Sequence, residues 1–236
     1  MGNAAKKRTG ERLKLVTFQS FDALKDLINK GYLECNEEYI DLGKAGATYS
    51  WVLEKMDGKI EGKMNAKYPI WCWVKCYNNI CPPKHKGKPV EGFDVKVSFT
   101  KPQEDVFITD FRRYSFLLNN MYIPDSLADK AKFDEKLKKF NITESELQAY
   151  VRPDLFDTHR TVDEYLEICQ EIRRSFDKCI TTDSDVLQGC VWRITLDEIE
   201  KIEFLNDRSY RFGSLNYIRS NGKRINWRED FYKKLC

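Results

Sequence analysis

Apolar and polar positions follow two different periods along the chain, and these periods define the expected strands and helices. Residues 13–18 (LKLVTF) alternate in polarity, which is typical of a half-buried strand. Apolar residues then recur at helical spacing over 21–28, with Ser20 placed to cap the start of this helix and Gly31 to end it. The chain therefore opens with a strand, a polar turn, a short helix and an extended segment from Tyr32.

Similar patterns assign the next part of the chain. They predict a helix at 47–57, a strand at 69–77, a loop at 78–92, strands at 93–100 and 105–109, and a helix at 111–121 that is entered through Asp110.

The middle of the chain is rich in Lys and Glu and predicts helices. They are expected at 126–140, 143–150 and 161–177. Because strand patterns surround this stretch, we interpret residues 124–180, approximately, as a charged helical insertion between two halves of a sheet.

Strand patterns return in the last part of the chain. They lie at 185–194 and 200–205, and Asn221-Gly222 between LNYIRS and KRINW is a strong hairpin signal. Strands, then helices, then strands predict an α+β class. We expect a flexible N-terminus at 1–12 and a single domain at 13–236.

Composition narrows the class of protein. Hydrophobic residues make up 42% and charged residues 33%, which is ordinary for a globular protein. The formal charge is only +3, so any contact with nucleic acid must come from a local patch. No apolar run is long enough for a membrane span, and the first residues lack the apolar core of a secretory signal. These features predict a cytoplasmic protein without membrane contact, in which the eight cysteines are free thiols.

Both ends of the domain resemble ADP-ribosyltransferases of the DarT-like kind, which act on nucleic acid. The opening LVTFQSFDALKDLINKGYLEC is similar to the first strand and helix of that fold, and DVLQGCVWRITLDEIEKIEFL to its closing strands. The resemblance implies a split β-sheet core that uses NAD as a substrate. In it, Thr17 and Gln19 would face the nicotinamide ribose, and Gln188 would stand where the catalytic glutamate is usual.

The sequence departs from that pattern at both ends. Glutamine at 188 can bind the ribose 2′-hydroxyl, but it lacks the charge with which glutamate stabilises the transition state. Thr17 and Gln19 stand where His or Arg is usual. These departures bear on catalysis and leave the expected fold unchanged.

A second resemblance covers nearly the whole chain. An uncharacterised bacterial family carries T-I-Q, Y-x-W-L, P-I-W-A-W, S-D-F-D and Q-A-T-F-W motifs. Recognisable forms of these motifs occur here in the same order, at Thr17–Gln19, Tyr49–Leu53, Pro69–Trp73, Thr109–Phe111 and Gln188–Trp192. This resemblance implies no activity.

Aromatic residues and one aspartate complete the candidate cofactor site. Tyr49, Trp51, Trp71 and Trp73 are candidates to pack against the rings of NAD, and their alternative role is core packing. Asp110 is a candidate to orient a ribose, and its alternative role is a helix N-cap.

Other chemistry has weaker support in the sequence. Cys72, Cys76, Cys81 and His85 have a tolerable but unfamiliar zinc spacing, and we expect no metal. Neither histidine, His85 or His159, lies near a nucleophile pattern, and no phosphate-binding glycine motif is present.

The C-terminal tail is basic and contains interleaved aromatic residues. Arg219, Lys223, Arg224 and Trp227 are the candidates for contact with nucleic acid, because cations neutralise phosphates and aromatic rings stack on bases. The alternative is a solvated edge hairpin, in which lysine and arginine prevent aggregation.

These observations predict an NAD-dependent ADP-ribosyltransferase, a toxin or antiviral defence effector that modifies RNA or DNA, with an antitoxin or regulatory protein as a further partner. One alternative is a non-catalytic module of the same fold that binds nucleotide or nucleic acid. Another is a protein that binds a partner through the charged helices.

Overall fold

The computed structural model describes residues 10–35, 42–81, 93–149, 162–205 and 217–219. The chain forms two compact units, which we describe separately. The first comprises Met1–Glu37, Gly58–Phe107 and Gln188–Cys236, and the second Glu38–Asp57 and Ile108–Leu187. Both strands and helices are present, so the predicted α+β class is confirmed.

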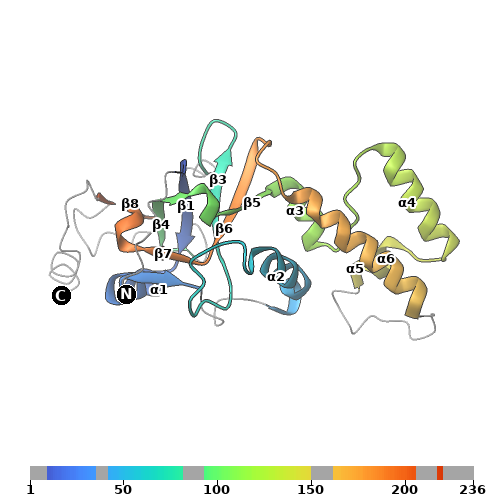
Figure 1. Cartoon of the computed structure of the whole chain (residues 1–236), viewed down its shortest axis with the longest axis horizontal. Helices are drawn as coiled ribbons and strands as arrows, with labels where there is room; N and C mark the ends of the chain where they lie inside the picture. Colours follow the sequence, from blue (N-terminus) through green and yellow to red (C-terminus); the bar gives the residue numbers. More distant parts are fainter. Residues whose placement is uncertain (1–9, 36–41, 82–92, 150–161, 206–216, 220–236) are drawn as a thin grey trace, which may run out of the picture. The chain divides into compact units, whose positions relative to one another are not determined.

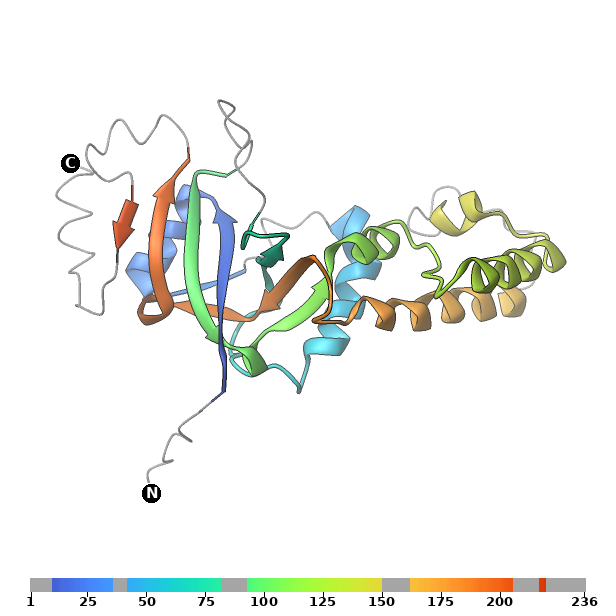
Figure 2. The same ribbon diagram turned by 90° about the horizontal axis from the view of Figure 1, so that it is seen from above.

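A mostly antiparallel sheet forms the first unit. Its strands are β1 (Arg12–Gln19), β3 (Ile70–Cys76), β4 (Val95–Pro102), most of β6 (Val186–Val191), β8 (Ile199–Phe204) and β9 (Tyr217–Arg219), in the order β6-β3-β1-β4-β8-β9. β1 pairs with both β3 and β4, and β4 pairs with β8, which puts β1, β4 and β8 side by side (Figures 1 and 2).

One face of these central strands forms the core of the first unit. On β4, Val97 and Phe99 alternate with polar positions and are buried, and the buried Leu15 of β1 pairs with Phe99. Helix α1 (Phe21–Lys30) buries Leu24 and Leu27. The predicted helix ends are confirmed, because Ser20 Oγ accepts a hydrogen bond from Ala23 N (3.2 Å) and Gly31 adopts the left-handed φ of 83° that favours glycine.

A second, two-stranded sheet corrects one prediction. The range 185–194, expected as one strand, is divided into β6 and β7 (Arg193–Thr195), and β7 pairs with β2 (Tyr32–Glu34). The division falls at Trp192, whose side chain is almost fully buried and donates a hydrogen bond from Nε1 to the carbonyl of Ile60 (3.0 Å). A hydrogen bond to a residue far away in the sequence therefore interrupts the strand over 185–194, although the local pattern of this segment is continuous.

The second unit is mainly helical. It contains α2 (Leu42–Met56), most of β5 (Phe107–Asp110), α3 (Phe111–Leu118), α4 (Leu127–Lys139), α5 (Glu144–Ala149) and α6 (Val162–Ser175). Helices α4 and α6 lie side by side (Figure 2), and Lys136 forms ion pairs with Glu167 (2.7 Å) and Glu171 (2.5 Å) between them. The predicted charged helices are thus present, and part of their charge is used to hold them together.

The remaining short elements are the 3-10 turns η2 (Gln103–Asp105), η4 (Phe176–Cys179) and η5 (Leu196–Glu198). The Asn221-Gly222 hairpin turn lies outside the described residues. Among the described helices, none has both the length and the apolar character that a membrane crossing requires.

Candidate functional site

Thr17 and Gln19 form one polar pair on β1. Their side chains share a face because strand side chains alternate, and Gln19 Nε2 donates to Thr17 Oγ1 (2.8 Å). Thr17 is buried and donates in turn to the carbonyl oxygen of Trp71 on β3 (2.7 Å). The hydroxyl of Thr17 is therefore already used to tie β1 to β3, and Gln19 is the more accessible member of the pair.

Gln188 on β6 is a buried amide with unsatisfied hydrogen-bonding capacity. Its side chain is 7% exposed, and within the described part of the chain its Nε2 has no hydrogen-bond partner. Such a group costs about 1–3 kcal/mol when it is left unpaired. β3 lies between β1 and β6, so the strands that carry Thr17 and Gln188 are not neighbours in the sheet.

Gly189 explains how Gln188 is held. A Cβ atom at Gly189 would lie 2.8 Å from Val106 Cγ1, 3.1 Å from Val74 Cγ2 and 3.2 Å from Cys72 Sγ. Only glycine permits β6 to pack this closely. Gln188 points to the opposite side of the strand from Gly189, so the tight packing fixes the strand that presents the amide.

The candidate ring-binding residues are divided between the two units. Trp71 and Trp73 are half-buried residues of β3 in the first unit, whereas Tyr49 and Trp51 lie on α2 in the second. Trp51 is 1% exposed, and its Nε1 donates to Asp177 Oδ1 (3.1 Å). Its ring also makes an edge contact with Phe176, so the structure assigns Trp51 to the core of its unit.

Asp110 is the N-cap of α3. Its Oδ1 accepts hydrogen bonds from the backbone N–H groups of Arg112 (2.7 Å) and Arg113 (3.1 Å). These two N–H groups have no acceptor within the helix, so Asp110 satisfies them. The capping role explains why this carboxylate is buried, and no ligand is needed to explain it.

We predict that Asp110→Ala destabilises the protein by about 1 kcal/mol, because the first turn of α3 loses its cap. Asp110→Asn keeps an accepting oxygen and should retain most of the stability. Urea unfolding of the three proteins measures both effects. Equal losses for the two substitutions would show that the negative charge matters, and not the cap.

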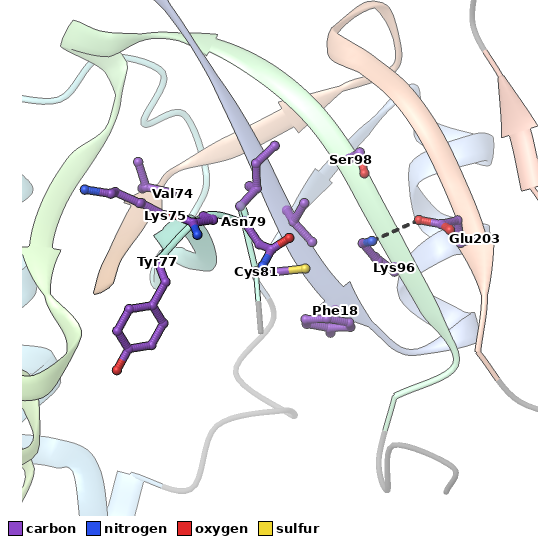
Figure 3. A pocket seen from close by; sticks show the side chains of 12 residues that line it. Phe18, Val74, Lys75, Tyr77, Asn79, Cys81, Lys96, Ser98 and Glu203 are labelled. Carbon is purple, nitrogen blue, oxygen red and sulfur yellow. Dashed lines mark ion pairs between the residues drawn. The ribbon is translucent and has the colours of Figure 1, made fainter. Parts of the chain in front are cut away.

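A hollow of about 750 Å³ lies on the other face of the sheet in the first unit. Val16 and Phe18 of β1, Lys96 and Ser98 of β4, Glu203 of β8 and the segment Val74–Cys81 line it (Figure 3). Because Val16 and Phe18 alternate with Thr17 and Gln19, the hollow and the predicted polar pair lie on opposite faces of β1. Sequence analysis did not identify this hollow, although the alternating polar positions of β4 were visible.

Charged side chains close one wall of the hollow. Lys96 Nζ lies 3.0 Å from Glu203 Oε2, and Lys201 Nζ lies 2.9 Å from Glu203 Oε1. Burial raises the pKa of Glu203, but hydrogen bonds from Lys201 and Lys96 outweigh it and hold this pKa below its usual range. The carboxylate thus stays ionised, and two lysines share one counter-charge.

Within the described residues, the buried thiol of Cys72 lacks the lowered pKa of an activated nucleophile. Burial raises the pKa of Cys72 to about 12, so its thiol stays protonated and donates to the carbonyl of Gly189 (3.3 Å). The described residues contain no cluster of His, Cys, Asp and Glu suited to a metal ion. His85 of the proposed zinc set lies outside them.

Most of the candidate nucleic-acid residues also lie outside the described residues, namely Lys223, Arg224 and Trp227. Arg219 is the last residue of β9, and its backbone pairs with Lys201 of β8. Their role in binding stays a prediction.

Comparison with known proteins gives one match. Residues 14–200 match a family described as "Domain of unknown function (DUF3841)". No curated protein and no solved structure matches the chain.

Proposed function

Because the chain belongs to the DUF3841 family, whose description names no activity, we propose a function from its own residues. The protein is an NAD-dependent ADP-ribosyltransferase with an ADP-ribosyltransferase-like fold. It acts in the cytoplasm on RNA or DNA, as a toxin or a defence effector.

The buried amide of Gln188 carries this proposal. Native proteins rarely leave a buried donor unpaired, and a functional role is one of the reasons for which such a donor is retained. Nε2 of Gln188 is such a donor in the described structure. The sequence resemblance aligns Gln188 with the catalytic glutamate of the ADP-ribosyltransferases. A ribose hydroxyl supplies the accepting oxygen that this donor lacks.

The reaction assigns a defined task to this amide. The bond between ribose C1′ and the nicotinamide nitrogen breaks, and the electron pair leaves with nicotinamide. An oxygen or nitrogen of the acceptor then bonds to C1′ and loses its proton. Gln188 would hold the 2′-hydroxyl next to C1′ and so orient the ribose. An amide has no charge to stabilise the cationic transition state, so we expect slow turnover.

Two measurements test the proposal. NAD should raise the unfolding temperature of the full chain, because a ligand that binds the folded state stabilises it. Incubation with NAD and RNA, DNA or protein should release nicotinamide and add the mass of ADP-ribose to one acceptor. The absence of both a thermal shift and nicotinamide release would exclude the function.

The neutral amide also favours a second candidate, a module that binds nucleotide without chemistry. This module shifts in unfolding temperature with NAD and releases no nicotinamide with any acceptor. Gln188→Ala separates the two candidates, since it weakens binding in both but removes turnover only from an enzyme.

A further inference from the structure

The face of the sheet around the hollow has a distinct composition. Cross-strand pairing places Lys14 beside Thr100, Phe18 beside Lys96, and Ser98 beside Lys201. The opposite face of the same strands is buried. The face around the hollow instead carries mostly polar and charged side chains, and we call it the basic face. Its residues are Arg12, Lys14, Val16, Phe18, Lys96, Ser98, Thr100, Lys201 and Glu203.

Positive charge is in excess on the basic face. It holds four cations, Arg12, Lys14, Lys96 and Lys201, against the single carboxylate of Glu203. Arg12 is directed along the face by hydrogen bonds to the carbonyl and hydroxyl of Thr100. Lys14 is exposed and has no ion pair among the described residues. The nearly neutral chain thus concentrates cations on one surface, which favours an anionic partner.

An aromatic ring lies within this charged surface. Phe18 is half-buried at the hollow, and its ring centroid is 6.1 Å from that of Phe93, which is 41% exposed. Asn79 and Ser98 bring polar groups to the same hollow (Figure 3). Cations beside an accessible ring on an open sheet are the combination that binds unpaired bases, since the ring stacks on a base while the cations hold the phosphates.

We infer that the basic face binds single-stranded nucleic acid, with a base in the hollow against Phe18 and phosphates along Lys14, Lys96 and Lys201. This inference rests on the proposed function, because the basic face would bind the nucleic acid that the proposed enzyme modifies. It places that surface on β1, β4 and β8, apart from the C-terminal residues named from the sequence. A duplex fits less well, because its bases are stacked and cannot enter a hollow.

The charge contribution is tested with a labelled 20-nucleotide strand, as RNA and as DNA, without NAD. Lys14→Ala/Lys201→Ala should weaken binding roughly tenfold at low salt and reduce the slope of log K against log salt by about 1.4. The matched control is Lys132→Ala/Lys138→Ala on α4, which removes the same charge from exposed positions and should change neither value. Equal losses in both double variants would overturn the inference.

The ring is tested separately. Phe18→Leu keeps apolar volume and should weaken binding about tenfold without changing the salt slope, and Phe18→Tyr should retain binding. Unchanged binding in Phe18→Leu would overturn the inference. So would an affinity for duplex or heparin equal to that for the single strand, because the face would then bind any polyanion. Strand binding with neither an NAD shift nor nicotinamide release would leave this inference standing and exclude the proposed enzyme. An NAD shift with nicotinamide release but without strand binding would overturn this inference and leave the proposed enzyme standing.

Discussion

Replacing Trp51 by alanine is expected to destabilise the protein by about 3–5 kcal/mol, the loss typical of a large side chain removed from a core. The indole is 1% exposed and contacts the ring of Phe176 edge-on at 6.3 Å. Its Nε1 donates to Asp177, which also pairs with Lys55 (2.7 Å). Alanine leaves a cavity and removes one partner of this carboxylate. Urea unfolding followed by circular dichroism measures the change.

Two further variants identify the cause of that loss. Trp51→Phe keeps most of the ring and removes only the N–H group, so it should cost clearly less than alanine. Phe111→Ala removes an aromatic side chain that is 42% exposed in the same unit, and it should cost about 1 kcal/mol or less. A Trp51→Ala protein with normal stability but no NAD response would contradict the core role and restore the ring-binding prediction.

Local signals made the first part of the fold predictable. The β1–α1 unit was predicted with its cap residues because Ser20 and Gly31 act on neighbouring backbone groups. The shared face of Thr17 and Gln19 follows from strand alternation in the same way, and their hydrogen bond agrees with it. Each of these inferences depends on residues only a few positions apart.

Long-range partners account for what the sequence did not reveal. Nothing near Trp192 indicates that its indole bonds to Ile60, and this contact divides the predicted strand into β6 and β7. Likewise, Trp51 finds Asp177 at a separation of 126 residues, so its pattern could not decide between core and pocket. The hollow was missed because it needs the pairing of β1, β4 and β8, which local periodicity does not supply.

Gln188→Leu is expected to abolish the NAD response and at the same time to stabilise the unliganded protein. Leucine has a similar volume and removes the amide whose Nε2 lacks a partner. Relief of that penalty should contribute about 1 kcal/mol, which raises the unfolding temperature by roughly 2–4 °C in a chain of this size. A gain in stability together with a loss of binding is the behaviour of a residue retained for function. Thermal unfolding with and without NAD measures both.

Thr109→Val provides the matched control for this substitution. Thr109 is fully buried on β5, and its Oγ1 is the other buried side-chain atom without a partner among the described residues. Valine should therefore stabilise the protein in the same way and leave the NAD response intact. If Gln188→Leu instead destabilises the protein, its amide makes a contact that holds the fold. If Thr109→Val also loses the NAD response, the response does not report on Gln188. Only a gain in both variants, with the NAD response lost in Gln188→Leu alone, agrees with a ribose held by this amide.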